Sequence, residues 1–276
     1  MKPLRVMIFI ALILALLYFR TVHWLVHAWL TDPCYSHGFL VSIISAFLAW
    51  RALRSARAPL PEREPGPYRN GLYLFACGLL IYILGFIAIF PFLMAVSFLF
   101  TLSGLILYFY GTALTRALLF PVAYLSFAIP LPAELLDVLG YHLQALSVRY
   151  PAALLALLGV PVTRVGAEIH LAQAAFTVGL PCSGMNSLIA LLALAALFIY
   201  LLQCPWYRKA ALLCAAVPIA IFANIARVTA LLLIAHAYGA ESATGFYHTL
   251  FSPLLFIIAF ICLITLSIPV GCKVHV

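Results

Sequence analysis

Three side chains that could carry out acyl transfer stand beside or within long apolar segments. Cys182 lies in the run Gly179-Leu-Pro-Cys-Ser-Gly-Met-Asn186, immediately before an unbroken apolar stretch. Arg227 interrupts a later stretch, and His248 comes just before the last one. A thiolate nucleophile, a cation for a developing oxyanion and a titratable proton carrier are the parts of a cysteine-dependent acyl transfer. These three residues are therefore the candidate catalytic set.

Composition predicts that membrane helices position this set. Of the 276 residues, 67% are hydrophobic and only 8% are charged, and the mean hydropathy is +1.18. Such a chain has too little polar surface to coat a soluble particle. Continuous apolar stretches without period-two alternation favour helices over a barrel. We therefore expect an all-α integral membrane protein, a polytopic bundle forming a single domain over residues 1–276.

The chain divides into about eight apolar stretches near the roughly 20 residues that cross a hydrocarbon core. They are residues 3–19, 38–53, 71–90, 92–110, 117–131, 183–202, 210–236 and 250–270. With eight crossings the segments in which basic residues crowd all fall on one side, which the positive-inside rule assigns to the cytoplasm. These basic positions are Lys2, Arg5, Arg51, Arg54, Arg57, Arg63, Arg69, Arg116, Arg208, Lys209 and Lys273. Both termini are then cytoplasmic. The lipid bilayer is the partner that composition implies, and the net charge of +8 needs no nucleic acid as a further partner.

This topology places Cys182 and His248 together at the outer face. The long outer segment 132–182 contains a helical apolar pattern over Glu134 to Tyr150, which predicts a short amphipathic helix in the interface. Residues 160–178 mix β-branched residues with Gly166, which is typical of a small β-hairpin before the sixth helix. Arg227 is expected about nine residues, or roughly 13 Å, below the outer end of its helix. A cation there costs at least about 2.5 kcal/mol, so its guanidinium is expected to reach upward to a functional partner.

The start of the sixth helix offers Cys182 a favourable environment. Ser183 is a possible cap of that helix, and the unpaired N–H groups of its first turn provide positive potential. This potential, together with Arg227, would favour the thiolate and hold a tetrahedral oxyanion. His248 would then protonate the departing amine.

Five segments, taken in order along the chain, match the motifs of one family of membrane enzymes. They are Trp29-Leu-Thr-Asp-Pro-Cys-Tyr-Ser-His-Gly-Phe-Leu-Val41, Ile129-Pro-Leu-Pro132, Pro181-Cys-Ser-Gly-Met-Asn-Ser-Leu188, Asn224-Ile-Ala-Arg227 and Gly245-Phe-Tyr-His248. Over most of its length the chain resembles the exosortases, multipass cysteine transpeptidases that process proteins carrying a PEP-CTERM sorting signal. The resemblance implies that Cys182, Arg227 and His248 are catalytic, with Ser183, Gly184 and Asn186 in the same motif as the cysteine. A histidine at the third position favours the bacterial branch of the superfamily.

The resemblance also implies a location, partners and a reaction. The protein would lie in the bacterial cytoplasmic (inner) membrane, with its active site at the periplasmic face and a role associated with exopolysaccharide. Its partners would be membrane-anchored client proteins that end in Pro-Glu-Pro, an apolar helix and a basic tail. The client would be cleaved through a thioester and passed to an acceptor, either water or an amine or glycan. No cofactor and no metal is implied.

Several polar residues could support this site, and each has a second interpretation. Asn224, one turn before Arg227, could orient the guanidinium or form a hydrogen bond between helices. Asp32 and His37 could support the site or fix the geometry of the first outer loop. Arg149 and Arg164 could pair with the glutamate of the sorting signal, although solvated or headgroup-binding charges are common at such positions.

Cys34 departs from the family pattern, in which the position after Asp32-Pro33 is often polar. It is the only other cysteine predicted outside, and a disulfide with Cys182 would silence the nucleophile. We therefore expect an accessory thiol there. The remaining five cysteines form no CxxC motif or metal-spaced cluster, and most of them are expected to be small apolar fillers. They are Cys77, Cys204, Cys214, Cys262 and Cys272.

Two further function classes are open. In a transporter or channel, Arg227 would be a substrate or counter-ion site, but the sequence shows no internal repeat of the kind that transporters carry. In a non-catalytic scaffold for exopolysaccharide assembly, Cys182 would be dispensable. Other intramembrane proteases are disfavoured because the chain has no HExxH motif and no Gly-x-Ser-x-Gly motif.

Overall fold

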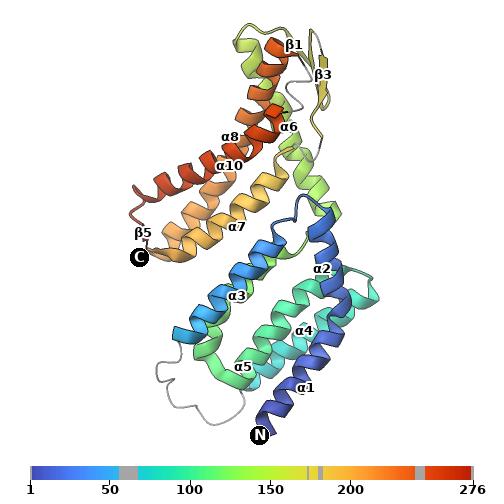
Figure 1. Cartoon of the computed structure of the whole chain (residues 1–276), viewed down its shortest axis with the longest axis vertical. Helices are drawn as coiled ribbons and strands as arrows, with labels where there is room; N and C mark the ends of the chain where they lie inside the picture. Colours follow the sequence, from blue (N-terminus) through green and yellow to red (C-terminus); the bar gives the residue numbers. More distant parts are fainter. Residues whose placement is uncertain (1, 56–67, 173, 180–182, 240–245, 275–276) are drawn as a thin grey trace. The chain divides into compact units, whose positions relative to one another are not determined.

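The computed structural model describes residues 2–55, 68–172, 174–179, 183–239 and 246–274 (Figure 1). The described chain is almost entirely helical and consists of two compact units, Met1–Leu131 and Pro132–Val276. Each unit is described by itself below.

The first unit contains six helical elements. They are α1 (Lys2–Leu17), α2 (Phe19–Thr31), α3 (Gly38–Ser55), α4 (Arg69–Ile87), α5 (Pro91–Tyr124) and the 3₁₀ turn η1 (Leu125–Ala128). Gly111 interrupts α5 with φ 79° and ψ −175°, so two expected apolar stretches follow one another within this element. The part before Gly111 packs on α4, and the part after it packs on α3, where Ser45 Oγ donates a 2.6 Å hydrogen bond to the carbonyl of Pro121.

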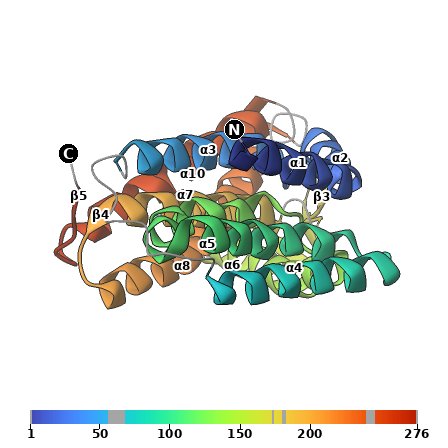
Figure 2. The same ribbon diagram turned by 90° about the horizontal axis from the view of Figure 1, so that it is seen from below.

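Helices α4 and α5 lie side by side (Figure 2). Their close approach depends on glycines spaced seven residues apart. Gly71, Gly78 and Gly85 face α5, and a Cβ at Gly78 would lie 2.5 Å from Thr101 Oγ1. Small residues of this kind allow helices to associate in lipid, where no hydrophobic force drives them together. Next to this contact the Tyr18 hydroxyl lies 2.9 Å from both Ser97 Oγ and Thr101 Oγ1, so that the buried polar groups satisfy one another.

The second unit contains the segments that carry the candidate catalytic residues. Its helices are α6 (Ala133–Leu157), α7 (Met185–Leu201), α8 (Trp206–Tyr238) and α10 (Phe246–Ser267). Its strands are β1 (Val162–Val165), β2 (Glu168–Leu171), β3 (Ala174–Thr177), β4 (Leu202–Gln203) and β5 (Lys273–Val274). Strands β1, β2 and β3 form an antiparallel sheet in that order. A three-stranded sheet therefore stands where a hairpin was expected before the helix that follows Cys182.

Helix α8 joins two cores in this unit. Near its start, Leu212 and Ala216 pack with residues of α7 and α10, including Ala195 and Leu263. Near its end, Val228, Leu232 and Ala235 pack with Val148 and Leu155 of α6 and with Ile169 of β2. With 33 residues, α8 is about 50 Å long at 1.5 Å per residue, well beyond the roughly 30 Å of a hydrocarbon core. Its last turns pack on α6 and on the sheet of β1, β2 and β3.

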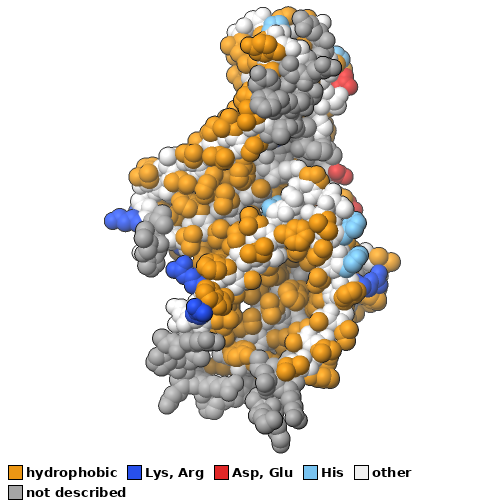
Figure 3. Space-filling model, viewed as in Figure 1, with side chains coloured by type: hydrophobic (Ala, Val, Ile, Leu, Met, Phe, Trp, Pro, Cys, Tyr) orange, Lys and Arg blue, Asp and Glu red, His pale blue; other side chains and the backbone are white. Residues whose placement is uncertain are grey.

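The described helices identify a multipass all-α membrane protein. Four of them, α3, α4, α5 with η1, and α8, are long and apolar enough to cross a membrane, and α1 with α2 makes a fifth candidate if that pair, bent by 59°, is one span. Two shorter apolar helices are Met185–Leu201 and Pro253–Ser267. Figure 3 shows apolar side chains spread over the visible face of the described residues and few charges among them.

Two expectations differ from the structure. The outer amphipathic helix is not short: α6 has 25 residues and ends at Leu157. It continues past Pro151, and Leu155 in its last turn is fully buried against β2 and α8. The first outer segment, expected over residues 20–37, is largely the helix α2, and only residues 32–37 form the connection to α3.

Candidate active site

A buried hydrogen-bond network fixes the chain directly after Cys182. The Asn224 Nδ2 group on α8 donates to Ser147 Oγ on α6 at 2.7 Å and to the carbonyl oxygen of Ser183 at 2.8 Å. Ser147 Oγ in turn donates to the same carbonyl at 3.0 Å. All three residues are buried, with exposed fractions of 5% or less. Two donors from two different helices thus hold the backbone of the residue that follows the candidate nucleophile.

Gly184 satisfies two requirements at the start of α7. Its φ of 96° lies in the left-handed region, which glycine adopts without steric cost. A Cβ at this position would lie 2.6 Å from Asn224 Cγ. The predicted cap at Ser183 was wrong, because Gly184 is the N-cap residue of α7 and no side chain caps the helix. Ser183 contributes its backbone carbonyl to the network instead.

Arg227 lies one turn beyond Asn224 on α8 and is 9% exposed. Eleven residues follow it before α8 ends at Tyr238, so it lies about 16 Å from that end. The contact between Gly184 and Asn224 nevertheless shows that α7 begins almost level with Arg227. The long upward reach expected for its guanidinium is therefore not needed, because the last turns of α8 rise beside α6 and the sheet.

The structure describes only the backbone of one of the two other candidate catalytic residues. Cys182 lies outside the described residues, between Gly179 and Ser183. His248 falls in the first turn of α10, whose backbone is described there while its side chain is not. Leu255, seven residues further along α10, lines the same small cavity as Arg227, so the backbone of His248 lies about 10 Å from that level along the helix axis.

The cavity beside Arg227 is formed by α7, α8 and α10, which we call the three-helix bundle. Ser187 and Leu191 of α7, Asn224 and Arg227 of α8, and Phe256 of α10 are among its lining residues. Its volume of about 10 Å³ is the room of a single water molecule. This cavity is too small to hold a peptide.

The predicted residues Arg149 and Arg164 lie on the surface of the second unit. Arg149 is exposed on α6, two residues after Ser147, and Arg164 is exposed on β1. Glu168 on the neighbouring strand contacts His170 at 3.1 Å. Asn186 lies half-buried in the first turn of α7. The buried network thus includes Asn224 and Ser183 from the predicted set, while both arginines stay outside it.

Asp32 and His37 belong to the first unit, in the connection between α2 and α3. Asp32 Oδ1 accepts a 2.8 Å hydrogen bond from the backbone N–H of Cys34, and His37 Nε2 lies 3.2 Å from the carbonyl of Phe127. The Tyr35 hydroxyl accepts from the backbone N–H of Leu131 at 2.9 Å. The first bond is internal to the connection, and the other two tie the connection to η1 and to Leu131 just beyond it. These contacts support the loop-geometry interpretation of Asp32 and His37.

A sequence model of the transmembrane exosortase family matches residues 29–265 of the 276. The chain belongs to this family. Searches of curated proteins and of solved structures found no match to it. The matched region begins at Trp29, at the end of α2, and stops two residues before the end of α10, so it contains the whole buried network but leaves out the C-terminal turn and β5.

Sequence reasoning missed three residues that organise this exosortase. In the sequence, Ser147 looks like one more polar position on an amphipathic helix. In the structure it is 98% buried and hydrogen-bonds to Asn224 and Ser183. Trp29 Nε1 donates a 2.7 Å hydrogen bond to the carbonyl of Ala128, and the Tyr35 hydroxyl accepts from Leu131. These two bonds join the motif at residues 29–41 to the segment that contains the motif at residues 129–132. The presence of both aromatic residues inside a motif was the available signal.

Burial controls the titration of the α2–α3 connection in the exosortase. Burial raises the pKa of the Cys34 thiol to about 11, and the Asp32 carboxylate adds to the shift. Cys34 is therefore protonated at neutral pH and a poor nucleophile. Burial also lowers the pKa of His37, against the opposing effect of its hydrogen bonds to the backbone. Among the described residues, no three His, Cys, Asp or Glu side chains gather as a metal site requires.

Proposed function

We propose that the chain is a membrane-embedded cysteine protease or transpeptidase that cleaves a C-terminal PEP-CTERM-type sorting signal and transfers the client protein to an acceptor. Membership of the transmembrane exosortase family supports a sorting function of this kind. The observation that carries the proposal for this chain is the hydrogen-bonded carbonyl of Ser183. Ser147 and Asn224 hold this carbonyl, and the buried cation Arg227 lies one helical turn beyond Asn224 on α8.

Each candidate residue has one role in the proposed reaction. The Cys182 thiolate attacks the carbonyl carbon of the scissile peptide and forms a C–S bond. Arg227 and the N–H groups at the start of α7 stabilise the oxyanion. His248 gives its proton to the nitrogen of the departing helix as the C–N bond breaks. An acceptor hydroxyl or amine then attacks the thioester and releases the thiol.

The network of Ser147, Asn224 and Ser183 would act as positioning machinery. A nucleophile displaced by about 1 Å can lose a large part of its rate, because covalent catalysis depends on alignment with the carbonyl. Asn224 also lies one turn before Arg227 on α8. Its contact with Ser183 and Gly184 therefore fixes the position of Arg227 along α8 relative to the start of α7. We assign Asn224 and Ser147 to positioning, and we keep the catalytic roles for Cys182, Arg227 and His248.

We further propose a topology of eight crossings within a single domain of residues 1–276 in a bacterial inner membrane, with both termini cytoplasmic. The start of α7, the start of α10 and Arg227 belong to one end of the three-helix bundle. Arg208, Lys209 and Lys273 belong to the other end, at the start of α8 and in β5. Basic residues favour the cytoplasmic side, which puts the candidate active site at the periplasmic face.

The proposed partners are membrane-anchored clients with Pro-Glu-Pro, an apolar helix and a basic tail. A client held in the same bilayer reaches the site by lateral diffusion, so the membrane supplies proximity. Arg149 and Arg164, exposed on α6 and β1, are proposed to pair with the glutamate of the signal. A transport function is disfavoured because the space beside Arg227 holds only about one water molecule.

The test is co-expression of a model client with the wild type, with Cys182→Ala and with Cys214→Ser. Cys214 is an exposed cysteine on α8 and serves as the matched control. Client size is followed by blot, and the new C-terminus is identified by mass spectrometry. We expect cleavage after the motif in the wild type and in the Cys214 variant, and none in the Cys182 variant. Equal processing by all three would overturn the proposal and favour the scaffold.

A further inference from the structure

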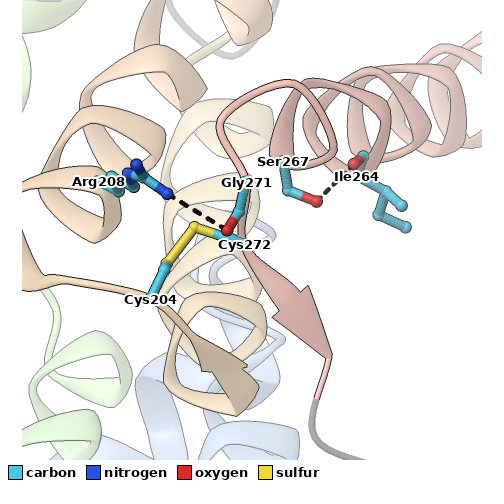
Figure 4. Close-up of a disulfide and its surroundings, with 6 residues drawn as sticks. All are labelled: Cys204, Arg208, Ile264, Ser267, Gly271 and Cys272. Carbon is cyan, nitrogen blue, oxygen red and sulfur yellow. Dashed lines mark hydrogen bonds between the residues drawn. A yellow bond between two sulfur atoms is a disulfide. The ribbon is translucent and has the colours of Figure 1, made fainter.

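The second unit contains a pair of cysteines that the proposed reaction does not use. Cys204 and Cys272 are joined by a disulfide with a Cα–Cα distance of 5.0 Å (Figure 4). Cys204 stands between β4 and α8, and Cys272 stands between the end of α10 and β5. The described cysteines elsewhere on these helices, Cys214 and Cys262, are exposed on apolar helices. Cys272 lies beyond the residues that match the family, so family membership does not account for the pair.

Noncovalent contacts of the surrounding chain also place Cys272 beside Cys204. After α10 the backbone turns back, with the N–H of Cys272 donating to the carbonyl of Ser267 at 3.1 Å. Strand β5 then pairs with β4, with Gln203 opposite Lys273. Cys272 is only 8% exposed and packs in the same core as Leu212 and Leu263. Noncovalent contacts thus hold the two sulfur atoms together, so reduction would not separate them far.

A cation lies against this turn. Arg208 Nη1 donates a 3.4 Å hydrogen bond to the carbonyl of Gly271, the residue before Cys272 (Figure 4). A nearby positive charge favours the thiolate, which is the form that exchanges with disulfides. Cys204 is half-buried, so an external disulfide reaches it more easily than it reaches Cys272. The pair therefore has one accessible sulfur, one shielded sulfur and a charge that promotes exchange.

We propose that Cys204 and Cys272 form a reversible thiol–disulfide pair, a redox-responsive site at the end of α7, α8 and α10 opposite the candidate active site. A Cys204 thiolate attacks a low-molecular-weight disulfide of the glutathione type, forms a mixed disulfide and releases one thiolate. The Cys272 thiolate then displaces the second, so that two protein thiols are oxidised and one small disulfide is reduced to two thiols. In the proposed topology the pair faces the cytoplasm, where lasting disulfides are rare and redox-sensing ones occur.

The bond would act on the reaction through α10. It closes a loop of sequence separation 68 that contains all of α8 and α10, and hence both Arg227 and His248. Leu255 and Phe256 of α10 line the cavity beside Arg227. Holding the far end of α10 limits the sliding of these residues along α8. This effect on rate depends on the proposed function, whereas the chemistry of the pair does not.

The test uses the full chain in native membranes equilibrated with reduced and oxidised glutathione at several ratios. The thiols are blocked with N-ethylmaleimide, the protein is digested without reduction, and the linked Cys204–Cys272 peptide is measured by mass spectrometry. We expect the linked fraction to rise from a small to a dominant share as the buffer becomes more oxidising. Cys214→Ser should keep this response, and Cys204→Ser or Cys272→Ser should abolish it. A linked peptide that never forms, or that persists in reduced glutathione alone, would overturn the proposal.

Two further readouts separate this inference from the proposed function. The thermal unfolding temperature of the purified chain should rise with the linked fraction, and client processing should rise about threefold or more with it. If the linked fraction and the unfolding temperature respond but no client is processed, the thiol pair stands and the proposed function fails. If clients are processed while no linked peptide forms, the reverse holds. A rate of client processing that stays constant while the linked fraction changes would overturn the coupling through α10.

Discussion

The side-chain amide of Asn224 donates a 2.8 Å hydrogen bond to the carbonyl oxygen of Ser183, across 41 residues of sequence. The same amide donates to Ser147, so α6 and α8 meet at the chain that leads into α7. Asn224 thereby lies between a candidate cation, Arg227, and the residue directly after a candidate nucleophile, Cys182. The proposed site depends on this link more than on any other described contact.

Removing the amide of Asn224 should disrupt the site. Asn224→Ala removes the hydrogen bond from the Asn224 amide to the Ser183 carbonyl and empties part of the helix contact. Loss of a buried hydrogen bond costs about 1–3 kcal/mol, so processing should fall by about fivefold or more if this cost falls on the positioning of the site. Client processing in membranes measures the effect, with protein level checked by blot. Wild-type rates in a well-expressed Asn224→Ala variant would show that the amide has no positioning role.

Substitution of Ser147 tests the same network from α6. Ser147→Ala removes a hydroxyl that both accepts from Asn224 and donates to Ser183. We expect a loss of about 1–3 kcal/mol in stability and a several-fold drop in processing. Tyr141→Phe, at an exposed position of the same helix, is the control and should change neither. Thermal unfolding in detergent and client cleavage are the two measurements. Equal behaviour of the two variants would contradict the assignment.

Two glycines permit a matched comparison of backbone strain with side-chain contact. Gly184 and Gly159 both have positive φ, at 96° and 79°, but a Cβ would meet Asn224 at Gly184 and nothing within 4 Å at Gly159. Alanine costs roughly 1–2 kcal/mol at either site for the left-handed backbone. Gly184→Ala should in addition displace Asn224 and abolish processing, whereas Gly159→Ala should retain it. Comparable processing by both variants would show that strain alone matters.

The first unit should lose stability in mild acid because of His37. Its pKa is lowered in the folded protein, mainly by burial, while the unfolded chain has a value near 6.5. Below about pH 6.5 the unfolded state therefore binds more protons, and the free energy of unfolding falls as pH falls towards the folded pKa. Unfolding temperatures of the wild type and His37→Gln should be compared at pH 7.5 and 5.5. The wild type should lose more stability than the variant; an equal loss would assign the effect to other groups.

The sequence predicts the membrane helices and the order of the motifs because apolar length and residue identity are local properties. It predicts that Asn224 and Arg227 share a helix face for the same reason. The apolar stretch 210–236 predicts α8 to within a few residues at either end, but it does not reveal that the last turns of this helix pack on α6 and the sheet. Ser147 is equally hidden, since its partners are 36 and 77 residues away. Long-range hydrogen bonds of this kind require the fold.

Arginine at position 227 should not be replaceable by lysine. A guanidinium offers five donors in a planar fork, whereas an ammonium is a compact charge on a flexible stem. Arg227 is 91% buried, so the geometry of its donors matters and solvent cannot compensate. Arg227→Lys should keep the expression level and lose most of the processing activity, by about tenfold or more. A fully active Arg227→Lys variant would reduce the role of Arg227 to that of a simple charge.

The most direct test of the central claim is the capture of a client fragment on Cys182. Purified wild-type protein is mixed with a model client without added acceptor, quenched in acid and analysed by mass spectrometry. The account predicts a thioester-linked client fragment on Cys182 that hydroxylamine releases and that Cys182→Ala does not form. Client cleavage at an undiminished rate by Cys182→Ala, with no adduct on the wild type, would contradict it.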